Sequence, residues 1–172
     1  MKEQRPDTAG MTAIRRASAR DFLDIAALDR LAWLGNRHGE FIPDGEHVWR
    51  LWCEHAWCFA ARLEGESCIE SPAGTLAGAI VAFPCLDGRF CVHKVMVLPA
   101  LRGRGIGSRL FAVLLEELDR QGVATFLTVD PSNESAQRLY ASWGYVRDRF
   151  VAGFYRPVED RWVLARSAGV QS

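Results

Sequence analysis

The amino-acid sequence predicts a single α/β domain, and three observations lead to that fold class. Segments with the two-residue hydrophobic period of strands alternate with segments that have the longer period of helices. A glycine-rich turn near the middle of the chain joins an apolar strand to an amphipathic helix. The 172 residues, 49% of them hydrophobic, suit one hydrophobic core. We therefore expect residues 11–172 to form one domain and the polar residues 1–10 to be a disordered tail.

The first third of the chain is predicted to contain a strand, a helix, a loop and a second helix. Residues 12–16 alternate as a short strand does. Ser18 is expected to cap a helix that carries four apolar residues toward one side, namely Phe22, Ile25, Ala26 and Leu28. A polar, turn-rich stretch follows, after which Asp44 is expected to cap a second helix from His47 to about Ala56.

The middle of the chain favours three consecutive antiparallel strands. Residues 57–63 and 75–83 are strand-like runs, and a turn at Asp87-Gly88 leads into a third run at residues 90–97. After the glycine-rich turn, apolar residues recur at helical spacing as far as Gly122, and they are Leu110, Phe111, Leu114, Leu115 and Leu118.

The last third is predicted to add a strand, a helix and two aromatic strands. The strand covers residues 124–129, and Ser132 or Asn133 caps a helix that ends at Trp143-Gly144. The closing strands span residues 145–154 and 161–165. Aromatic strands at the end of a sheet are compatible with a homodimer.

Charge and hydropathy exclude several classes of partner. The 21 basic residues are balanced by 21 acidic ones, so no general field attracts phosphate backbones, and we expect no nucleic-acid partner. The longest nearly uncharged stretch, residues 72–86, is too short and too rich in Gly and Pro for a membrane helix. The first ten residues lack the apolar core of a secretory signal, which predicts a cytoplasmic protein.

The cysteines and histidines do not have the spacing of metal ligands. Five cysteines form no C-x-x-C pair, so neither a disulfide framework nor a zinc ribbon is indicated. A bridge between Cys85 and Cys91 across a hairpin is conceivable, and free thiols are favoured over it. His38, His47 and His55 do not match a metal-binding motif, so we predict no metal.

The strongest functional signal is the loop between Val97 and Leu110, which has three glycines in five positions. Glycines let the backbone turn tightly and present N–H groups at a helix start, where the helix dipole favours anions such as a pyrophosphate. Three arginines lie beside them, Arg102, Arg104 and Arg109. The plainer interpretation is a strand-to-helix turn with solvated arginines.

Two familiar phosphate-binding loops fit this segment less well. A Walker A loop requires Lys-Ser or Lys-Thr after the glycines, and neither follows here. A dinucleotide fingerprint matches at Gly103, Gly105 and Asp130, with Ser108 in place of the third glycine. A dinucleotide-binding fold needs more strand and helix pairs than remain after Val129. A dinucleotide-binding oxidoreductase is therefore the weaker alternative.

Two blocks of the sequence resemble the GNAT superfamily of N-acetyltransferases. The first is Val95-Met96-Val97-Leu98-Pro99-x-x-Arg102-Gly103-x-Gly105-x-Gly107, which resembles the acyl-CoA loop of that family. The second is Asn133-x-x-Ala136-x-x-Leu139-Tyr140-x-x-x-Gly144-Tyr145, which is similar to the helix that follows. The resemblance implies a GNAT-like fold, a mixed, mostly antiparallel central sheet that is splayed between strands 4 and 5 and flanked by about four helices.

The resemblance also implies which residues bind acetyl-CoA in the gap between those strands. Val95, Met96 and Val97 would line the pantetheine arm, and backbone N–H groups near Val97 would hold the thioester carbonyl and the oxyanion. The pyrophosphate would bind the loop at Arg102, Gly103, Arg104, Gly105, Ile106, Gly107 and Ser108. Asn133 resembles a cofactor-contacting Asn of the family, and a plain helix N-cap is an equally good interpretation.

Acetyl transfer to an amine also needs a general acid and a base. Tyr140 is the candidate acid because a phenol can return a proton to a departing thiolate of similar basicity, although periodicity alone favours a core tyrosine. Some GNAT members carry a Glu five residues before the Asn, and Thr128 holds that position here. His93 is predicted to substitute for it by relaying a proton through water.

Several neighbouring residues have more than one interpretation. His93 could instead be satisfied within the sheet or face solvent, and the alternative bases are Glu40, Asp44 and Glu46. Three aromatic residues could wall the acceptor pocket or simply pack between helices, namely Trp33, Phe41 and Trp49.

The sequence therefore predicts an acetyl-CoA-dependent N-acetyltransferase. A primary amine would attack the thioester directly in a ternary complex, since no cysteine lies in or immediately after either block. The acceptor would be a small-molecule amine or a protein amine, and balanced charge gives no preference between them. The absent carboxylate at Thr128 motivates one alternative, a catalytically silent module that binds or senses acyl-CoA.

Overall fold

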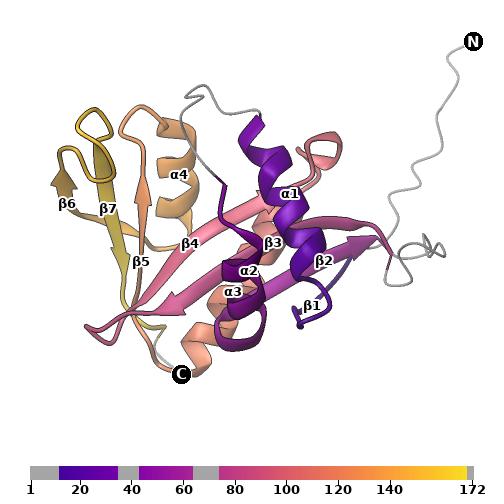
Figure 1. Ribbon diagram of the computed structural model, residues 1–172. Coiled ribbons are helices and arrows are strands. Elements are labelled where there is room, and N and C mark those ends of the chain that lie inside the picture. Colours follow the sequence, from indigo (N-terminus) through magenta and orange to yellow (C-terminus); the bar gives the residue numbers. More distant parts are fainter. Residues whose placement is uncertain (1–11, 35–42, 64–73, 170–172) are drawn as a thin grey trace, which may run out of the picture.

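A computed structural model describes residues 12–34, 43–63 and 74–169 (Figure 1). They form a seven-stranded sheet in the order β1-β2-β3-β4-β5-β7-β6. The strands are β1 (Thr12–Arg16), β2 (Trp57–Leu63), β3 (Leu76–Pro84), β4 (Phe90–Val97), β5 (Thr125–Val129), β6 (Val146–Val151) and β7 (Arg161–Arg166). The helices are α1 (Phe22–Leu34), α2 (Glu46–His55), α3 (Ile106–Arg120), α4 (Glu134–Ser142) and a 3₁₀ turn, η1 (Pro99–Leu101). The predicted tail lies outside the described residues.

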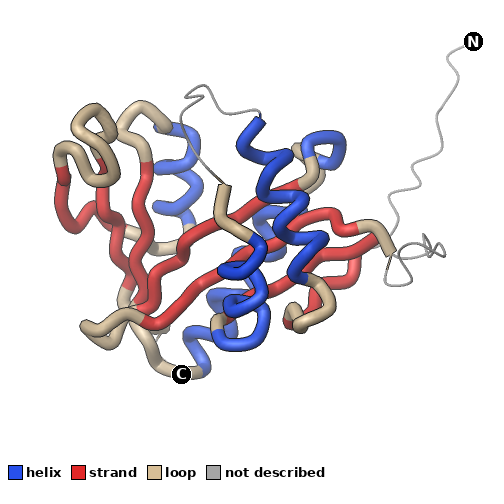
Figure 2. Tube along the Cα trace, viewed as in Figure 1, coloured by secondary structure: helices blue, strands red, loops and turns tan. Residues whose placement is uncertain are grey.

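Helices cover both faces of the sheet (Figure 2). In Figure 1, α1 and α2 lie in front of β2, β3 and β4, and α3 lies behind them. One apolar core lies between the sheet and the pair α3 and α4, and a second lies between the sheet and the pair α1 and α2. The predicted α/β class with a mixed, mostly antiparallel sheet is confirmed.

The strands β1 to β4 form an antiparallel half of the sheet, as predicted for β2, β3 and β4. A shift in the β3–β4 register interrupts it, because Lys94 pairs with Val81 and Val92 pairs with Ala82. His93 is therefore the extra residue of a β-bulge. The bulge brings His93 and Lys94 to the face that α1 and α2 cover, where the strand alternation would have placed only one of them.

α3 packs closely on β3 and β4 through its apolar side, which comprises Ile106, Leu110, Phe111, Leu114, Leu115 and Leu118. Gly78 on β3 permits this approach. A Cβ at Gly78 would lie 2.7 Å from the Met96 carbonyl oxygen and 3.0 Å from Leu110 Cδ1, closer than real side chains come. The start of α3 is thus held against the end of β4, which fixes the glycine loop between them.

β4 and β5 run parallel but pair over only two residue pairs, Phe90 with Thr125 and Cys91 with Phe126. Beyond Cys91 the two strands diverge, which confirms the predicted splay between strands 4 and 5. In Figure 1, β5, β7 and β6 stand steeply at the left, whereas β1 to β4 cross the molecule. At the closed end of the splay, Asp119 of α3 accepts two hydrogen bonds from the Arg166 guanidinium of β7.

Several predicted element ends differ from the structure by a residue or more, and three of the differences are informative. α1 starts at Phe22 rather than after Ser18, because the intervening turn is closed by Ser18 groups that donate to the Asp21 carboxylate. The prediction that Asp44 caps α2 is wrong, since the N-cap residue is Gly45 and no side chain caps the helix. The strand predicted to reach residue 154 ends at Val151, because Gly153 enters a turn with φ of 59°.

Candidate active site

A cavity of about 300 Å³ lies where β4 parts from β5, between the end of β4, the glycine loop and the starts of α3 and α4. The structure brings nine predicted site residues to its wall, namely Val95, Val97, Arg102, Gly103, Gly105, Ile106, Gly107, Ser108 and Tyr140. Leu101, Phe111 and Leu139 complete the lining, and sequence reasoning missed them because apolar residues at helical spacing also fit a core.

The backbone of β4 presents polar groups toward the gap. Leu98 N–H donates to the Ala77 carbonyl at 2.8 Å, so Val97 occupies a position whose own N–H and C=O point away from β3. The Arg102 Nε, 3.4 Å from the Val97 oxygen, reaches that carbonyl from the gap side. Because backbone direction alternates, Val95 shares this orientation. Two amides thus face the space that a thioester would occupy.

The glycine loop presents a second set of amides. Gly103 and Gly105 have φ of 76° and 75°, a region in which residues with a Cβ are strained. Gly105 is the N-cap of α3 without any side-chain cap, and the first helical bond runs from Arg109 N–H to the Gly105 carbonyl. The amides of the first turn therefore have no helical acceptor, an arrangement that binds phosphate groups.

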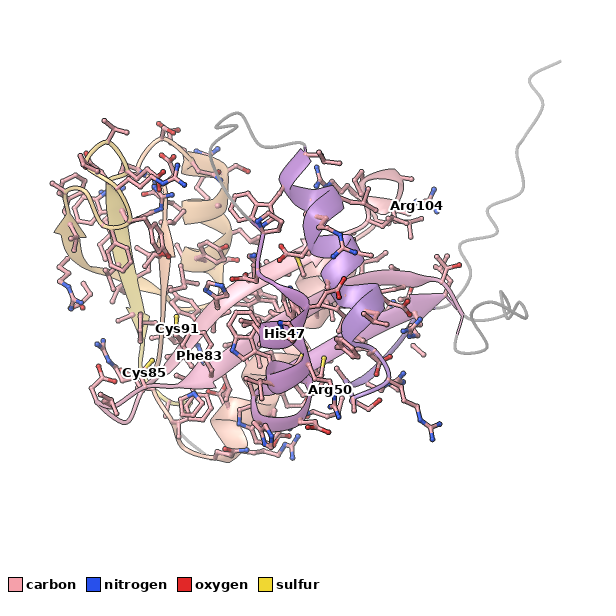
Figure 3. The ribbon with its side chains drawn as sticks, in the orientation of Figure 1. His47, Arg50, Phe83, Cys85, Cys91 and Arg104 are labelled. Atoms are coloured by element: carbon pink, nitrogen blue, oxygen red, sulfur yellow. The ribbon has the colours of Figure 1, made fainter. Side chains whose placement is uncertain are left out.

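The arginines of the loop differ in what they contact. Arg102 lines the cavity, and Arg104 is exposed at the outer side of the loop (Figure 3). Arg109, predicted only as added charge, donates from Nη2 to the Thr12 carbonyl at 2.7 Å and so ties α3 to β1.

Besides Arg104, two predicted cofactor residues do not line this cavity. The Met96 side chain is buried in the core under α1 and α2, on the opposite face of the sheet from Val95 and Val97. Asn133 is the N-cap of α4, and its side-chain oxygen accepts a hydrogen bond from Ala136 N–H at 3.0 Å. The plain N-cap interpretation of Asn133 thus has a physical basis, and its contact with a cofactor stays a prediction.

Tyr140 lies in the cavity wall with its ring against Phe111 and Tyr145, at centroid distances of 5.6 and 6.2 Å. Burial raises the pKa of the Tyr140 phenol, so the group keeps its proton at neutral pH. A protonated phenol at the cavity wall can donate to a developing anion. The ring thus packs against the core, as periodicity predicts, while the residue also lines the cavity, and its role as the general acid stays a prediction.

His93 lies on the other face of β4, under α2. Its ring is flanked by Trp52 and Phe83 at centroid distances of 5.1 and 5.7 Å, and its side chain is 26% exposed. The Nε2 atom lies 3.3 Å from Asp44 Oδ2. Asp44 also accepts a hydrogen bond from Lys94 Nζ at 2.5 Å.

The Asp44 carboxylate is strongly held in its ionised form. Burial opposes ionisation, but hydrogen bonds from His93 and Lys94 outweigh that effect and lower the pKa of Asp44 to about 2. Asp44 is thus an anion at all physiological pH values. A carboxylate with so low a pKa is a weak base, which disfavours its direct use in proton abstraction.

The other acidic and aromatic candidates have structural partners or are not described. Glu46 forms an exposed ion pair with Arg30. Trp49 is fully buried and donates from Nε1 to Asp29 of α1, as expected for an aromatic residue that packs between helices. Trp33 lies with its ring 4.9 Å from Lys94 Nζ. Glu40 and Phe41 lie outside the described residues.

Thr128, at the position of the missing carboxylate, has a partner that the sequence did not reveal. Its hydroxyl lies 3.0 Å from the hydroxyl of Tyr155, which belongs to the connection between β6 and β7. Tyr155 is 49% exposed, and the Arg161 guanidinium lies over its ring. Sequence spacing could not indicate this contact because 27 residues separate the two side chains.

The described cysteines are free thiols: Cys53, Cys58, Cys85 and Cys91. Cys85 and Cys91 lie together near the β3–β4 hairpin (Figure 3), and no bridge joins them. Burial raises the pKa of Cys91 to about 12, so its thiol is a poor nucleophile at neutral pH. Within the described ranges, no three His, Cys, Asp or Glu side chains gather as a metal site would need, and no helix is long and apolar enough to cross a membrane.

Comparison with known proteins gives a family and a fold. Residues 23–145 match the family described as Acetyltransferase (GNAT) family. The crystal structure of the ribosomal-protein-S18-alanine N-acetyltransferase from Escherichia coli superposes with a TM-score of 0.75 at 21% sequence identity. The match covers 94% of this chain and 97% of that chain, which shows that the two share a fold.

Two curated relatives match parts of the chain. The N-alpha-acetyltransferase RimI of Mycobacterium tuberculosis (strain ATCC 25618 / H37Rv) is 39% identical over 79 residues, which are 45% of this chain and 49% of that protein. An uncharacterised protein of Mycobacterium leprae (strain TN) is 29% identical over 150 residues, which are 84% of this chain and 39% of that protein. The chain thus spans half or less of the length of both relatives.

Proposed function

The chain belongs to the acetyltransferase (GNAT) family, and from that membership we propose that it transfers the acetyl group of acetyl-CoA to a primary amine. The observation that carries the proposal is the cavity at the splay, which has backbone amides of β4 at one end and the uncapped start of α3 at the other. Acetyl-CoA pairs a thioester with a pyrophosphate, and these two sets of amides suit those two groups.

The cavity has the shape and chemistry that a pantetheine arm requires. Its wall is mainly apolar, formed by side chains such as Val95, Val97 and Phe111, and it leads from the glycine loop to Tyr140. A Cβ at Gly107 would lie 3.5 Å from Val97 Cγ2, an ordinary van der Waals distance, so the start of α3 lies close to β4. Amides of Val95 and Val97 would hold the thioester carbonyl and then the oxyanion.

The acid and the base would act from opposite faces of β4. Tyr140 lies on the face with α3 and α4, and His93 lies on the face with α1 and α2. An amine that enters from the His93 face would attack a thioester in the gap, while the leaving thiolate would receive the Tyr140 proton. This arrangement supports direct attack in a ternary complex, and the high pKa of Cys91 gives no support to a covalent cysteine intermediate.

The first acceptors to test are peptide N-termini, because the relative from Mycobacterium tuberculosis is named as an N-alpha-acetyltransferase. Small polyamines form the second class, since the sequence predicts a small-molecule amine or a protein amine without preference. Residues 11–172 as one domain, a cytoplasmic location and a homodimer stay predictions from the sequence.

Binding of acetyl-CoA tests the proposed site. Replacing Gly105 by Val forces a Cβ into a conformation with φ of 75° and disturbs the amides at the start of α3. We expect calorimetric titration with acetyl-CoA to show affinity at least about tenfold weaker than in the wild type, a loss of about 1.4 kcal/mol.

The matched control is Gly122→Val. Gly122 has φ of 65° near the other end of α3, and neither glycine has an atom within 4 Å of a built Cβ. Both variants carry similar backbone strain, so equal affinity losses in the two would contradict the site. Release of free CoA thiol that depends on an added amine separates an enzyme from a silent acyl-CoA-binding module. Binding of NADH without binding of CoA would favour the oxidoreductase alternative.

A further inference from the structure

A charged cluster lies beside His93 on the face of β4 that α1 and α2 cover. Lys94 Nζ donates to Asp44 Oδ2 at 2.5 Å and to Asp29 Oδ1 at 2.8 Å. Asp29 is fully buried, and its other oxygen accepts hydrogen bonds from Trp49 Nε1 and from the Asp44 backbone N–H. The cluster therefore fixes Asp44, on the segment before α2, relative to both α1 and β4.

The cation of this cluster is a lysine, a residue type that is rare in this sequence. The chain has two lysines, Lys2 and Lys94, and its other basic residues are arginines. Lys94 is 14% exposed and its ammonium is shared between two carboxylates from different segments. An ammonium is compact and can donate to two carboxylates at once in a small space, whereas a guanidinium is planar and larger.

The charged groups around His93 carry more negative than positive charge. Asp29 and Asp44 carry two negative charges and Lys94 carries one positive charge, so the cluster has a net charge of −1 while His93 is neutral. Protonation of His93 makes the cluster neutral. Asp29 belongs to α1, Asp44 to the segment before α2, and Lys94 to β4. The rings beside His93 are Trp52 of α2 and Phe83 of β3.

We propose that Asp44, held in place by Lys94, is the positioning residue for His93 as the base of acetyl transfer. A hydrogen bond from His93 Nε2–H to Asp44 Oδ2 fixes the tautomer in which Nδ1 carries the free lone pair. The bulge places His93 two residues from Val95, whose amide faces the gap. This inference rests on the proposed function and adds to it the residues that replace the carboxylate missing at Thr128.

Transfer of the acetyl group to a protonated acceptor amine releases one proton overall. His93 Nδ1, directly or through water, takes one proton from the acceptor ammonium, and the free amine forms a bond to the thioester carbonyl carbon. The carbon–sulfur bond then breaks, and the thiolate takes the Tyr140 proton. The amide nitrogen returns a proton to Tyr140, and His93 releases its own proton to solvent. The products are an amide, free CoA thiol and one proton.

Exchange of the His93 Nε2 proton with water, followed by NMR, tests the pairing without any need for activity. The chain has four histidines, and the His93 resonance is the one that disappears in His93→Gln. A ring N–H that donates to a carboxylate exchanges slowly, so we expect this proton to be observed in the wild type and to be lost in Asp44→Ala, where the acceptor is gone. A proton that is not observed in the wild type, or that persists in Asp44→Ala, overturns the proposal.

The dependence of kcat on the acceptor's own amine pKa, at one fixed pH, tests the catalytic role. We expect kcat to fall by about tenfold or more in Asp44→Asn with an acceptor that is an ammonium at the assay pH, and the loss to be smaller with a weakly basic amine that is already neutral, because only the ammonium needs a base. A structural defect would lower kcat equally for the two acceptors. Equal losses for the two acceptors overturn the proposal. The control Glu54→Gln removes an exposed α2 carboxylate that pairs with Arg50 and should leave both readouts unchanged.

The outcomes separate this inference from the proposed function. A wild-type protein that binds acetyl-CoA but acetylates no amine in the panel overturns the proposed function, and with it the catalytic role of the pair. A His93 Nε2 proton that is observed in the wild type and lost in Asp44→Ala would still establish the Asp44–His93 pairing. A wild-type protein that acetylates an amine while Asp44→Asn keeps its full kcat with every acceptor overturns the inference alone.

Discussion

At the scale of single residues, Tyr140 gives the sharpest test of the chemistry. Its phenol lies at the cavity wall and burial keeps it protonated, so it can donate to a thiolate that leaves from the gap. We expect Tyr140→Phe to lower kcat by about 10²-fold or more, as loss of a general acid does, and to leave the affinity for CoA nearly unchanged. Steady-state kinetics and calorimetric titration measure the two effects.

Tyr145→Phe is the matched control for that substitution. Tyr145 contacts the same Phe111 ring, but its hydroxyl is 2.7 Å from the buried Thr125 hydroxyl. Loss of this hydrogen bond should cost about 1 kcal/mol of unfolding free energy and leave kcat within about twofold of the wild type. Equal kcat in Tyr140→Phe and the wild type would remove the acid role from Tyr140.

Residue roles were predictable from sequence where backbone conformation decides them. The glycine spacing predicts a tight loop, and Gly103 and Gly105 both have positive φ, a region in which glycine is unstrained. The local pattern predicts that Asp44 caps a helix, whereas its carboxylate pairs with His93 and Lys94 of β4. That pairing depends on a contact across some 50 residues of chain, which no local pattern encodes.

Among the secondary-structure elements, β4 contributes three different features along its eight residues. Its edge presents amides to the gap, its α3 face gives Val95 and Val97 to the cavity, and its α1 face carries His93 and Lys94. The resemblance implied the first two features, although it also named Met96, whose side chain lies on the α1 face. Strand alternation could not predict the third, because the bulge at His93 breaks the two-residue period and no residue type in that segment requires a bulge.

The start of α1 depends on a buried ion-pair network around Asp21. The Asp21 side chain is 1% exposed and accepts hydrogen bonds from Arg15 of β1 and Arg62 of β2. Burial opposes its ionisation, but these hydrogen bonds outweigh that effect and lower the pKa of Asp21. We expect Asp21→Asn to lower the unfolding free energy by about 3 kcal/mol, because Arg62 is left buried with less compensation. Urea unfolding followed by tryptophan fluorescence measures the change.

Arg30→Gln is the control for that prediction on the same helix. It breaks the ion pair with Glu46, in which the two side chains are 51% and 48% exposed. Water and salt screen such a pair, so the unfolding free energy should change by less than about 1 kcal/mol. Equal effects of the two substitutions would show that the buried network gives α1 no special stability.

At the scale of the whole molecule, the cavity exists because two parts of one sheet are held together at one end only. β4 and β5 share two residue pairs, and beyond them the strands part to form the cavity. The resemblance of two sequence blocks implied this splay, and the structure shows its physical basis. α3 and α4 fill the space behind the gap with apolar side chains, including Phe111 and Tyr140, so the sheet can open without exposing its core.

The Asp119–Arg166 pair lies at the closed end of the splay, where β4 and β5 are still paired. It should make the stability of the fold depend on pH. Its two hydrogen bonds, of 2.6 and 2.7 Å, join α3 to β7, and the Arg166 guanidinium lowers the pKa of Asp119. Because the folded pKa lies below the unfolded value of about 3.9, the pair stabilises the fold above that pH and loses its effect as pH falls through the folded pKa. Asp119→Asn should lower the unfolding free energy by about 2 kcal/mol at pH 7.

The decisive measurement is the slope of unfolding free energy against pH, from urea unfolding between about pH 2 and pH 7. In Asp119→Asn the fall in stability below about pH 4 should be shallower than in the wild type, because one carboxylate with a lowered pKa is gone. Asp87→Asn is the control, since Asp87 also has a lowered pKa from Arg89 but is exposed in the β3–β4 turn, where water screens the pair. If Asp119→Asn and Asp87→Asn had the same slope, the pair at the closed end would not hold the two parts of the sheet together. A shallower slope in Asp119→Asn alone, accompanied by weaker binding of acetyl-CoA, would connect that joint to the geometry of the cavity.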